Sequence, residues 1–310
     1  MADATYSDEL LRDADSAAAD AAREAHEEVL AREGMQDRFE SPKKSKRRAR
    51  KIARQSTSGD GWHHFVVDVW LVDLNPTEFG IFKHSRNRAK SRQFTKDMDI
   101  IAEVIEDGER TALIGYRKDL WKNNDDAGKR LVFKMFTDKL HWRATMDLML
   151  ARSIQQTLGA RLLPVMTYAV NNSGEDQVVY IERSANKWPL LPENFSFFLM
   201  NNGQMEFFRI RQDFFRLGDD YTVYNGRNEE VAVLDGAFLT IAGKWRGRVR
   251  EDYAATPLLN TLKLFCSMLI FKDHCRSHVK SVSKKVLQGE LDPKIEKQER
   301  DLYMNPRRVR

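Results

Sequence analysis

From residue 65 onward, short apolar runs alternate with clusters of turn-forming residues. The runs are rich in Val, Ile, Phe, Tyr and Thr, and Gly, Asn, Asp and Pro separate them. β-Branched and aromatic residues favour strands, and Asn-Gly or Asp-Gly steps favour tight hairpins. The pattern predicts about twelve strands, at 65–74, 79–84, 99–106, 110–117, 130–136, 165–170, 178–183, 195–200, 204–212, 221–225, 230–234 and 238–250. The expected fold class is therefore mainly β (α+β), built as a barrel or a sandwich.

One additional helix is expected at 138–158, between these strands. Its apolar positions recur at helical spacing, which places them on one face of a helix. Thr137 can cap its start, and Gly159 can end it. The positions are Trp142, Met146, Met149, Leu150, Ile154 and Leu158.

A second helix is expected from Thr256 to about His274. Thr256 is a good N-cap, and Pro257 suits a first turn. Ten of the fourteen residues in 258–271 are apolar. A helix that is apolar around most of its circumference lies in lipid or is enclosed by protein. Fourteen residues rise about 21 Å, which is short of the ~30 Å hydrocarbon core. We therefore expect the strands to enclose this helix.

Composition fits a folded protein without a transmembrane segment. The chain has 310 residues, of which 42% are hydrophobic and 10% aromatic, enough for a sizeable core and too many for a wholly disordered chain. Two cysteines exclude a disulfide framework. No run of 18 apolar residues occurs, and residues 1–20 do not resemble a secretory signal. The expected location is the cytoplasm, with peripheral attachment to a membrane, or the nucleus for a eukaryotic source.

Charge divides the chain into four expected regions. Residues 1–40 hold twelve Asp/Glu and four Arg, and residues 41–59 hold eight Lys/Arg and no acid. Such segregation is typical of tails and linkers. We expect an acidic, Ala-rich tail with helical tendency at 1–40, a polybasic linker at 41–61, a barrel domain at 62–275 and a charged tail at 276–310. The expected polybasic arm consists of Lys43, Lys44, Lys46, Arg47, Arg48, Arg50 and Lys51.

Two further basic groups are candidate anion sites. Side chains alternate faces along a strand, so Lys244, Arg246, Arg248 and Arg250 share one face, while Trp245 and Val249 point to the other. A row of cations without an acid among them can bind phosphates, or it can be an ordinary solvated face. The second group lies on an expected loop and consists of Lys83, Arg86, Arg88, Lys90 and Arg92.

Residues that would indicate catalysis or a metal are sparse. His274 and His278 have the i, i+4 spacing of zinc ligands, but no third ligand is evident nearby. Asp97 and Asp99 share a strand face, yet acids at strand ends are usually solvated. No nucleophile elbow, phosphate loop or dinucleotide fingerprint occurs. We therefore expect no catalytic residue, no metal and no cofactor, although an enzyme is not excluded.

One segment resembles a known family. Arg211-Gln212, Leu217-Gly218 and Tyr221-Thr222-Val223, continued by residues 234–241, resemble a signature of LURP-one-related proteins. That resemblance implies the tubby-like and phospholipid-scramblase fold, a twelve-stranded barrel around an apolar helix near the C-terminus. It covers about 205–245, extended by the helix to about 275. Few strands separate the motif from the helix here, so strands from 62–200 would complete the barrel, and no ligand-binding residue is transferred.

The resulting hypothesis is a non-enzymatic peripheral module. The resemblance implies binding of phosphoinositides or other lipids, and the basic groups would recognise anionic lipid headgroups or another polyanion. A nucleic-acid-binding protein using the same cations is one alternative. A structural subunit is another, which would dock on protein partners through residues 1–40 and 281–310.

Overall fold

The computed structural model describes residues 61–69, 93–95, 98–122, 128–185, 192–201, 203–213, 220–236, 243–292 and 299–300. The chain separates into two units, Met1–Gln55 and Ser56–Arg310, and all of the described residues belong to the second. The strand expected at 79–84 lies outside them, as do the acidic tail and the polybasic linker up to residue 60.

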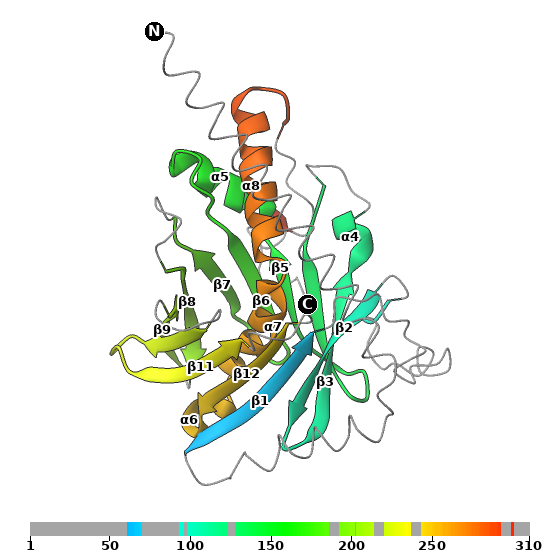
Figure 1. Ribbon diagram of the computed structural model, residues 1–310, viewed down its shortest axis with the longest axis vertical. Coiled ribbons are helices and arrows are strands. Elements are labelled where there is room, and N and C mark those ends of the chain that lie inside the picture. The colour runs from blue at the N-terminus through cyan, green and yellow to red at the C-terminus, as the bar shows by residue number, and fades with distance from the viewer. Residues whose placement is uncertain are drawn as a thin grey trace, which may run out of the picture. The chain divides into compact units, whose positions relative to one another are not determined.

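The strands of the described ranges form one closed antiparallel barrel (Figure 1). Each strand pairs with the strands before and after it in the chain, and β1 pairs with β12 to close the ring. The strands are β1 (Trp62–Val69), β2 (Met98–Glu106), β3 (Glu109–Arg117), β4 (Val132–Thr137), β5 (Trp142–Leu148), β6 (Thr167–Asn172), β7 (Val178–Arg183), β8 (Asn194–Asn201), β9 (Gln204–Gln212), β10 (Tyr221–Asn225), β11 (Glu230–Gly236) and β12 (Lys244–Arg250). The expected mainly β barrel is confirmed.

The helix expected at 138–158 is wrong in its first half. There the chain forms β5, and helix α5 covers only Leu150–Gly159. Thr137, expected to cap the helix, ends β4, and Leu140 takes a positive φ of 60° in the turn that follows.

The difference arises because the apolar residues of this segment also recur at every second position, which is the spacing of a strand. Ala144, Met146 and Leu148 alternate along β5 and are buried, which is the spacing of a strand. Backbone pairing with β4 and β6 selects the strand. Tertiary pairing thus overrides an apparent helical stripe.

Helix α7 (Pro257–Leu269) lies inside the ring of strands, as the sequence predicts. It contacts β1, β4, β5, β6 and β8, and it passes through the middle of the barrel in Figure 1. The Thr256 hydroxyl accepts a hydrogen bond from the Leu258 backbone N–H at 3.3 Å and so caps its start. Phe265 lies edge-on to Phe195 and Tyr221, with ring centroids 4.9 and 5.8 Å apart. The apolar circumference of this helix is thereby buried in the barrel core.

The remaining helices lie at the two ends of the barrel. The expected second helix ends earlier than predicted, at Leu269, and a separate helix α8 (Lys272–Leu287) follows and packs against α5. Cys266 and Cys275 therefore lie on different helices, and both are buried and free. The short helices are α4 (Lys118–Lys122) and α6 (Glu251–Ala254).

The up-and-down order gives the barrel two unlike ends. At one end lie the short hairpins β2–β3, β4–β5, β6–β7, β8–β9 and β10–β11, together with α6. We name this the hairpin end. The longer connections and α8 lie at the opposite end.

Candidate functional site

The outer face of β12 presents the basic row that the sequence predicts. Arg246 and Arg248 are exposed, and Lys244 and Arg250 are half-buried at the strand's ends. Trp245 and Val249 are buried on the opposite face, as expected from strand alternation. We call Lys244, Arg246, Arg248 and Arg250 the outer basic row.

Acids from other segments partly neutralise this row. Lys244 Nζ lies 2.8 Å from Asp68 Oδ2 on β1, and Arg248 Nη2 lies 3.2 Å from Glu230 Oε1 on β11. Arg250 Nη2 lies 2.6 Å from Asp252 Oδ2. The sequence shows no acid within the row, but strand pairing sets Asp68 of β1 opposite Lys244 and brings Glu230 of β11 within reach of the Arg248 side chain. Sequence reasoning missed Asp68 and Glu230 because they lie on other strands, whereas Asp252 directly follows the row in the sequence.

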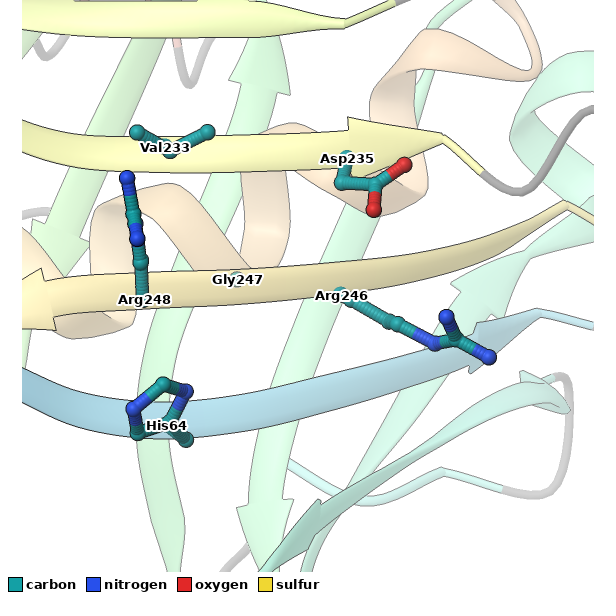
Figure 2. Close-up of a pocket in the computed structure, with 6 residues that line it drawn as sticks. All are labelled: His64, Val233, Asp235, Arg246, Gly247 and Arg248. Atoms are coloured by element: carbon teal, nitrogen blue, oxygen red, sulfur yellow. The ribbon is translucent and has the colours of Figure 1, made fainter. Parts of the chain in front are cut away.

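Arg246 is the member of the row without an ion pair among the described residues. Its partners in register are Asp235 on β11 and Val66 on β1. In Figure 2 its side chain extends toward β1 and away from Asp235. An exposed guanidinium in this position is available to an anion from outside.

A shallow hollow lies beside Arg246. It has a volume of about 320 Å³ and opens on the outer surface of β1, β11 and β12. Figure 2 shows its lining, in which Arg248 extends toward Val233 on β11. The Arg248 guanidinium also lies 4.7 Å from the centroid of the Trp62 ring. The residues that line the hollow are His64, Val233, Asp235, Arg246, Gly247 and Arg248.

The other predicted cations lie outside the described residues. These are Lys83, Arg86, Arg88, Lys90 and Arg92, and the polybasic arm of Lys43, Lys44, Lys46, Arg47, Arg48, Arg50 and Lys51.

The candidate metal and acid positions do not form a site within the part of the chain that the structure describes. There, no group of three His, Cys, Asp or Glu side chains is arranged to hold a metal ion. His274 is exposed, and the His278 ring lies edge-on to Trp121 with centroids 5.6 Å apart. Asp99 lies 3.4 Å from Lys118, and Asp97 is outside the described ranges.

A buried charged cluster closes the barrel at the end opposite the hairpins. Glu193 Oε1 accepts hydrogen bonds from Arg183 Nε and Nη2 at 3.1 and 2.7 Å. Glu193 Oε2 lies 3.2 Å from Lys272 Nζ and accepts a hydrogen bond from the Tyr221 hydroxyl at 3.2 Å. Burial raises the pKa of Glu193, but Lys272 and Arg183 lower it by more, so this pKa is below its ordinary value.

A second buried pair lies toward the hairpin end. Lys263, on α7, places Nζ 2.8 Å from Glu106 Oε1, and His63 Nε2 lies 2.7 Å from the same oxygen. Burial raises the pKa of Glu106, but the Lys263 charge and hydrogen bonds from Lys263, Thr111 and His63 lower it below its ordinary value. The first cluster sets one carboxylate between two cations, and the second pairs Glu106 with Lys263. Lys263 on α7 and Lys272 on α8 thereby tie both helices to the barrel.

No helix among the described residues has both the length and the apolar character needed to span a bilayer. In comparisons with known proteins, no protein-family model, no curated protein and no solved structure matches this chain.

Proposed function

We propose that this protein is a non-enzymatic peripheral module that binds an anionic membrane surface through the outer face of β12. The observation that carries the proposal is Arg246, which is exposed beside a hollow and has no ion pair among the described residues. The other three members of the outer basic row are held by acids of the same chain.

The hollow suits a phosphate-sized headgroup better than a large substrate. It lies on the outside of a sheet, and its polar lining includes the cations Arg246 and Arg248 and a histidine, His64. A guanidinium can donate two parallel hydrogen bonds to a phosphate. Asp235 also lines the hollow, so an anion would bind on the β1 side, toward which Arg246 extends.

The family resemblance is part of the same proposal. A closed twelve-strand barrel around an apolar helix is the architecture that a tubby-like or LURP-one-related protein would have. Under this assignment, phosphoinositides are the favoured lipids. The cations at 43–51 and 83–92 would then add long-range attraction to the same membrane.

Nucleic acid is the second candidate ligand. Single-strand binders place aromatic faces beside cations, and Trp62 lies next to Arg248 on the outer surface. Trp245 cannot serve in this way because it is buried. A structural subunit that docks through residues 1–40 and 281–310 remains a third hypothesis.

The test is co-sedimentation of the full chain with vesicles of phosphatidylcholine alone, or with phosphatidylserine or a phosphoinositide added. We expect binding only to anionic vesicles, weakened by salt. Arg246→Glu should reduce this binding about tenfold, because each cation near a lipid surface contributes about 1 kcal/mol and the reversal adds repulsion.

The matched control is Arg143→Glu, which makes the same charge change at an exposed position of β5, five strands away in the barrel. Its effect should be much smaller. Equal binding to neutral and anionic vesicles, or no binding at low salt, would discard the proposal. Binding of a single-stranded RNA oligonucleotide by a protein that ignores vesicles would favour the second candidate.

A further inference from the structure

The β8–β9 hairpin carries a cluster of exposed apolar side chains. Four large hydrophobic residues among those described are exposed, and three of them lie on this hairpin: Phe198 at 53%, Met205 at 60% and Phe207 at 36%. The register places Phe198 opposite Phe207 and the half-buried Met200 opposite Met205. The two phenylalanine rings have centroids 5.2 Å apart. We call Phe198, Met200, Met205 and Phe207 the apolar tip.

Folding of the barrel does not account for the apolar tip. Phe197, Leu199 and Phe208 point inward from the same strands and already fill the core. Single exposed apolar residues are common on protein surfaces, but adjacent ones that form a patch mark contact sites. The tip is therefore a candidate contact site.

The tip is held in place by a neighbouring turn. The Gln177 side chain donates a hydrogen bond to the Phe198 carbonyl at 3.2 Å and accepts one from the Met200 backbone N–H. β7 pairs with β8 only at Glu182 and Arg183. Beyond these positions, the Gln177 side chain supplies hydrogen bonds to the β8 backbone in place of strand pairing. A tip ordered in advance loses little conformational freedom when it is inserted into a partner.

Charge around the tip favours an anionic partner. The outward positions of β8, β9 and β10 include two arginines, Arg209 and Arg211, and no carboxylate. Arg209 contacts the Asn228 side-chain oxygen at 2.8 Å and the Tyr224 ring at 5.5 Å, and neither partner neutralises its charge. At about 3.4 Å per residue, these cations lie about 7 and 14 Å behind Phe207 along β9.

This arrangement matches the layers of a membrane surface. Peripheral segments bury apolar side chains about 5–10 Å deep, and cations behind them meet the headgroups. The exposed Glu175 and Asp176 precede Gln177 on the β7 side. On the β10 side, the exposed Glu229 and Glu230 lie in ion pairs with Arg250 and Arg248. The hairpin would therefore enter with its β9–β10 side turned toward anionic headgroups.

We propose that the β8–β9 hairpin is a membrane-penetrating element, which inserts the apolar tip into an anionic leaflet and sets Arg209 and Arg211 at headgroup level. This inference rests on the proposed membrane function but concerns a different surface from the outer basic row.

The experiment uses the full chain and vesicles of phosphatidylcholine with about 30% phosphatidylserine. The double variant Phe198→Thr with Phe207→Thr should lose about tenfold or more of its binding, because it removes the two inserted rings. The control is Leu287→Thr, which removes an exposed leucine at the end of α8. Its binding should stay within about twofold of the unmodified chain.

Insertion is measured directly with a fluorophore sensitive to polarity on Met205→Cys. Cys266 and Cys275 are fully buried, so the label should react at the new position. Anionic vesicles should shift its emission to the blue, and lipids with a quencher on the upper acyl chain should quench it. The same label on Leu287→Cys should not respond.

The outcomes separate the two proposals. Suppose that the double variant binds anionic vesicles as well as the unmodified chain does, and that the label at 205 shows neither a blue shift nor quenching. The hairpin inference is then overturned, and the proposed function stands. If the double variant loses binding and Arg246→Glu does not, the hairpin is the membrane contact and the outer basic row is not. If the unmodified chain binds no vesicles, both proposals fail. If it is a dimer that the double variant makes monomeric, the tip is a self-association surface and the membrane inference is overturned.

Discussion

The β8–β9 hairpin contains two pairs of phenylalanines in opposite situations. Phe197 and Phe208 point into the barrel, stack with centroids 5.4 Å apart, and are 2% and 0% exposed. Phe198 and Phe207 are their neighbours in sequence and point outward. The inner pair is explained by the core, whereas nothing described in the chain covers the outer pair. The difference separates residues that build the fold from residues left available to a partner.

β12 shows the same division with charges. Its inward residues, Trp245 and Val249, belong to the core, and most of its outward cations have acidic partners in the chain. Most cations on the outer face of β12 are thus paired with acids of the same chain. The apolar side chains on the outer face of β8–β9 are not covered by any described residue. We therefore expect mutations to affect stability on inner faces and binding on outer faces.

The largest contrast is expected between Phe208→Ala and Phe207→Ala. The first creates a core cavity and should lower the free energy of unfolding by about 3–5 kcal/mol. The second removes a partly exposed ring and should cost less than about 1 kcal/mol. Urea denaturation followed by circular dichroism measures both values. Equal losses would mean that the outer pair also supports the fold.

Glu193→Gln tests the buried charged cluster. It leaves Arg183 and Lys272 buried without a carboxylate, and we expect a loss of about 3 kcal/mol in unfolding free energy. The pKa of Glu193 is lowered in the folded protein, so its contribution is present above the ordinary value of 4.5 and is lost as pH falls below it. In the variant, stability should fall less steeply between about pH 5 and pH 3. An unchanged acid dependence would show that Glu193 is not stabilised in its charged form.

Gly247→Ala tests the inner face of β12. A Cβ at this position would lie 2.0 Å from the Phe65 ring, so the ring must move within a packed core. We expect a loss of about 1–3 kcal/mol, seen as a lower midpoint of thermal unfolding. Phe65→Leu in the same chain should recover part of this loss. The steric explanation fails if Phe65→Leu lowers the midpoint of thermal unfolding further.

The smallest effect on stability is expected for Lys244→Ala, on the outer face of the same strand. Its ion pair with Asp68 is partly exposed, and such pairs contribute about 0–1 kcal/mol. Denaturation at low and high salt measures this contribution. A larger loss would place Lys244 among the residues that build the fold.

Much of the fold follows from local patterns in the sequence. β7, β9 and β10 have the predicted bounds, because period-2 alternation and turn residues act within a few positions. The enclosure of α7 follows from its apolar circumference and its length. β5 was missed because Trp142, Met146 and Leu150 fit a helix as well as a strand, and only pairing with β4 and β6 decides between them.

The candidate surface was less predictable than the fold. Alternation gave the direction of Arg246 and Trp245, since it is a property of one strand. The acids that pair with Lys244 and Arg248 lie on neighbouring strands of the barrel, and local patterns do not reveal which strands are neighbours. The outward phenylalanines of β8 and β9 look like ordinary strand residues until it is known which face is already filled.

The position of α7 after the last strand has a consequence for synthesis. The ribosome makes all of the described strands before the helix that fills their interior, and the ring closes only when β12 reaches β1, about 180 residues earlier in the chain. Until then the apolar inner face of the nascent sheet is exposed to solvent. Growing chains in this condition aggregate or bind chaperones. The barrel core can therefore fill only after α7 has left the ribosome.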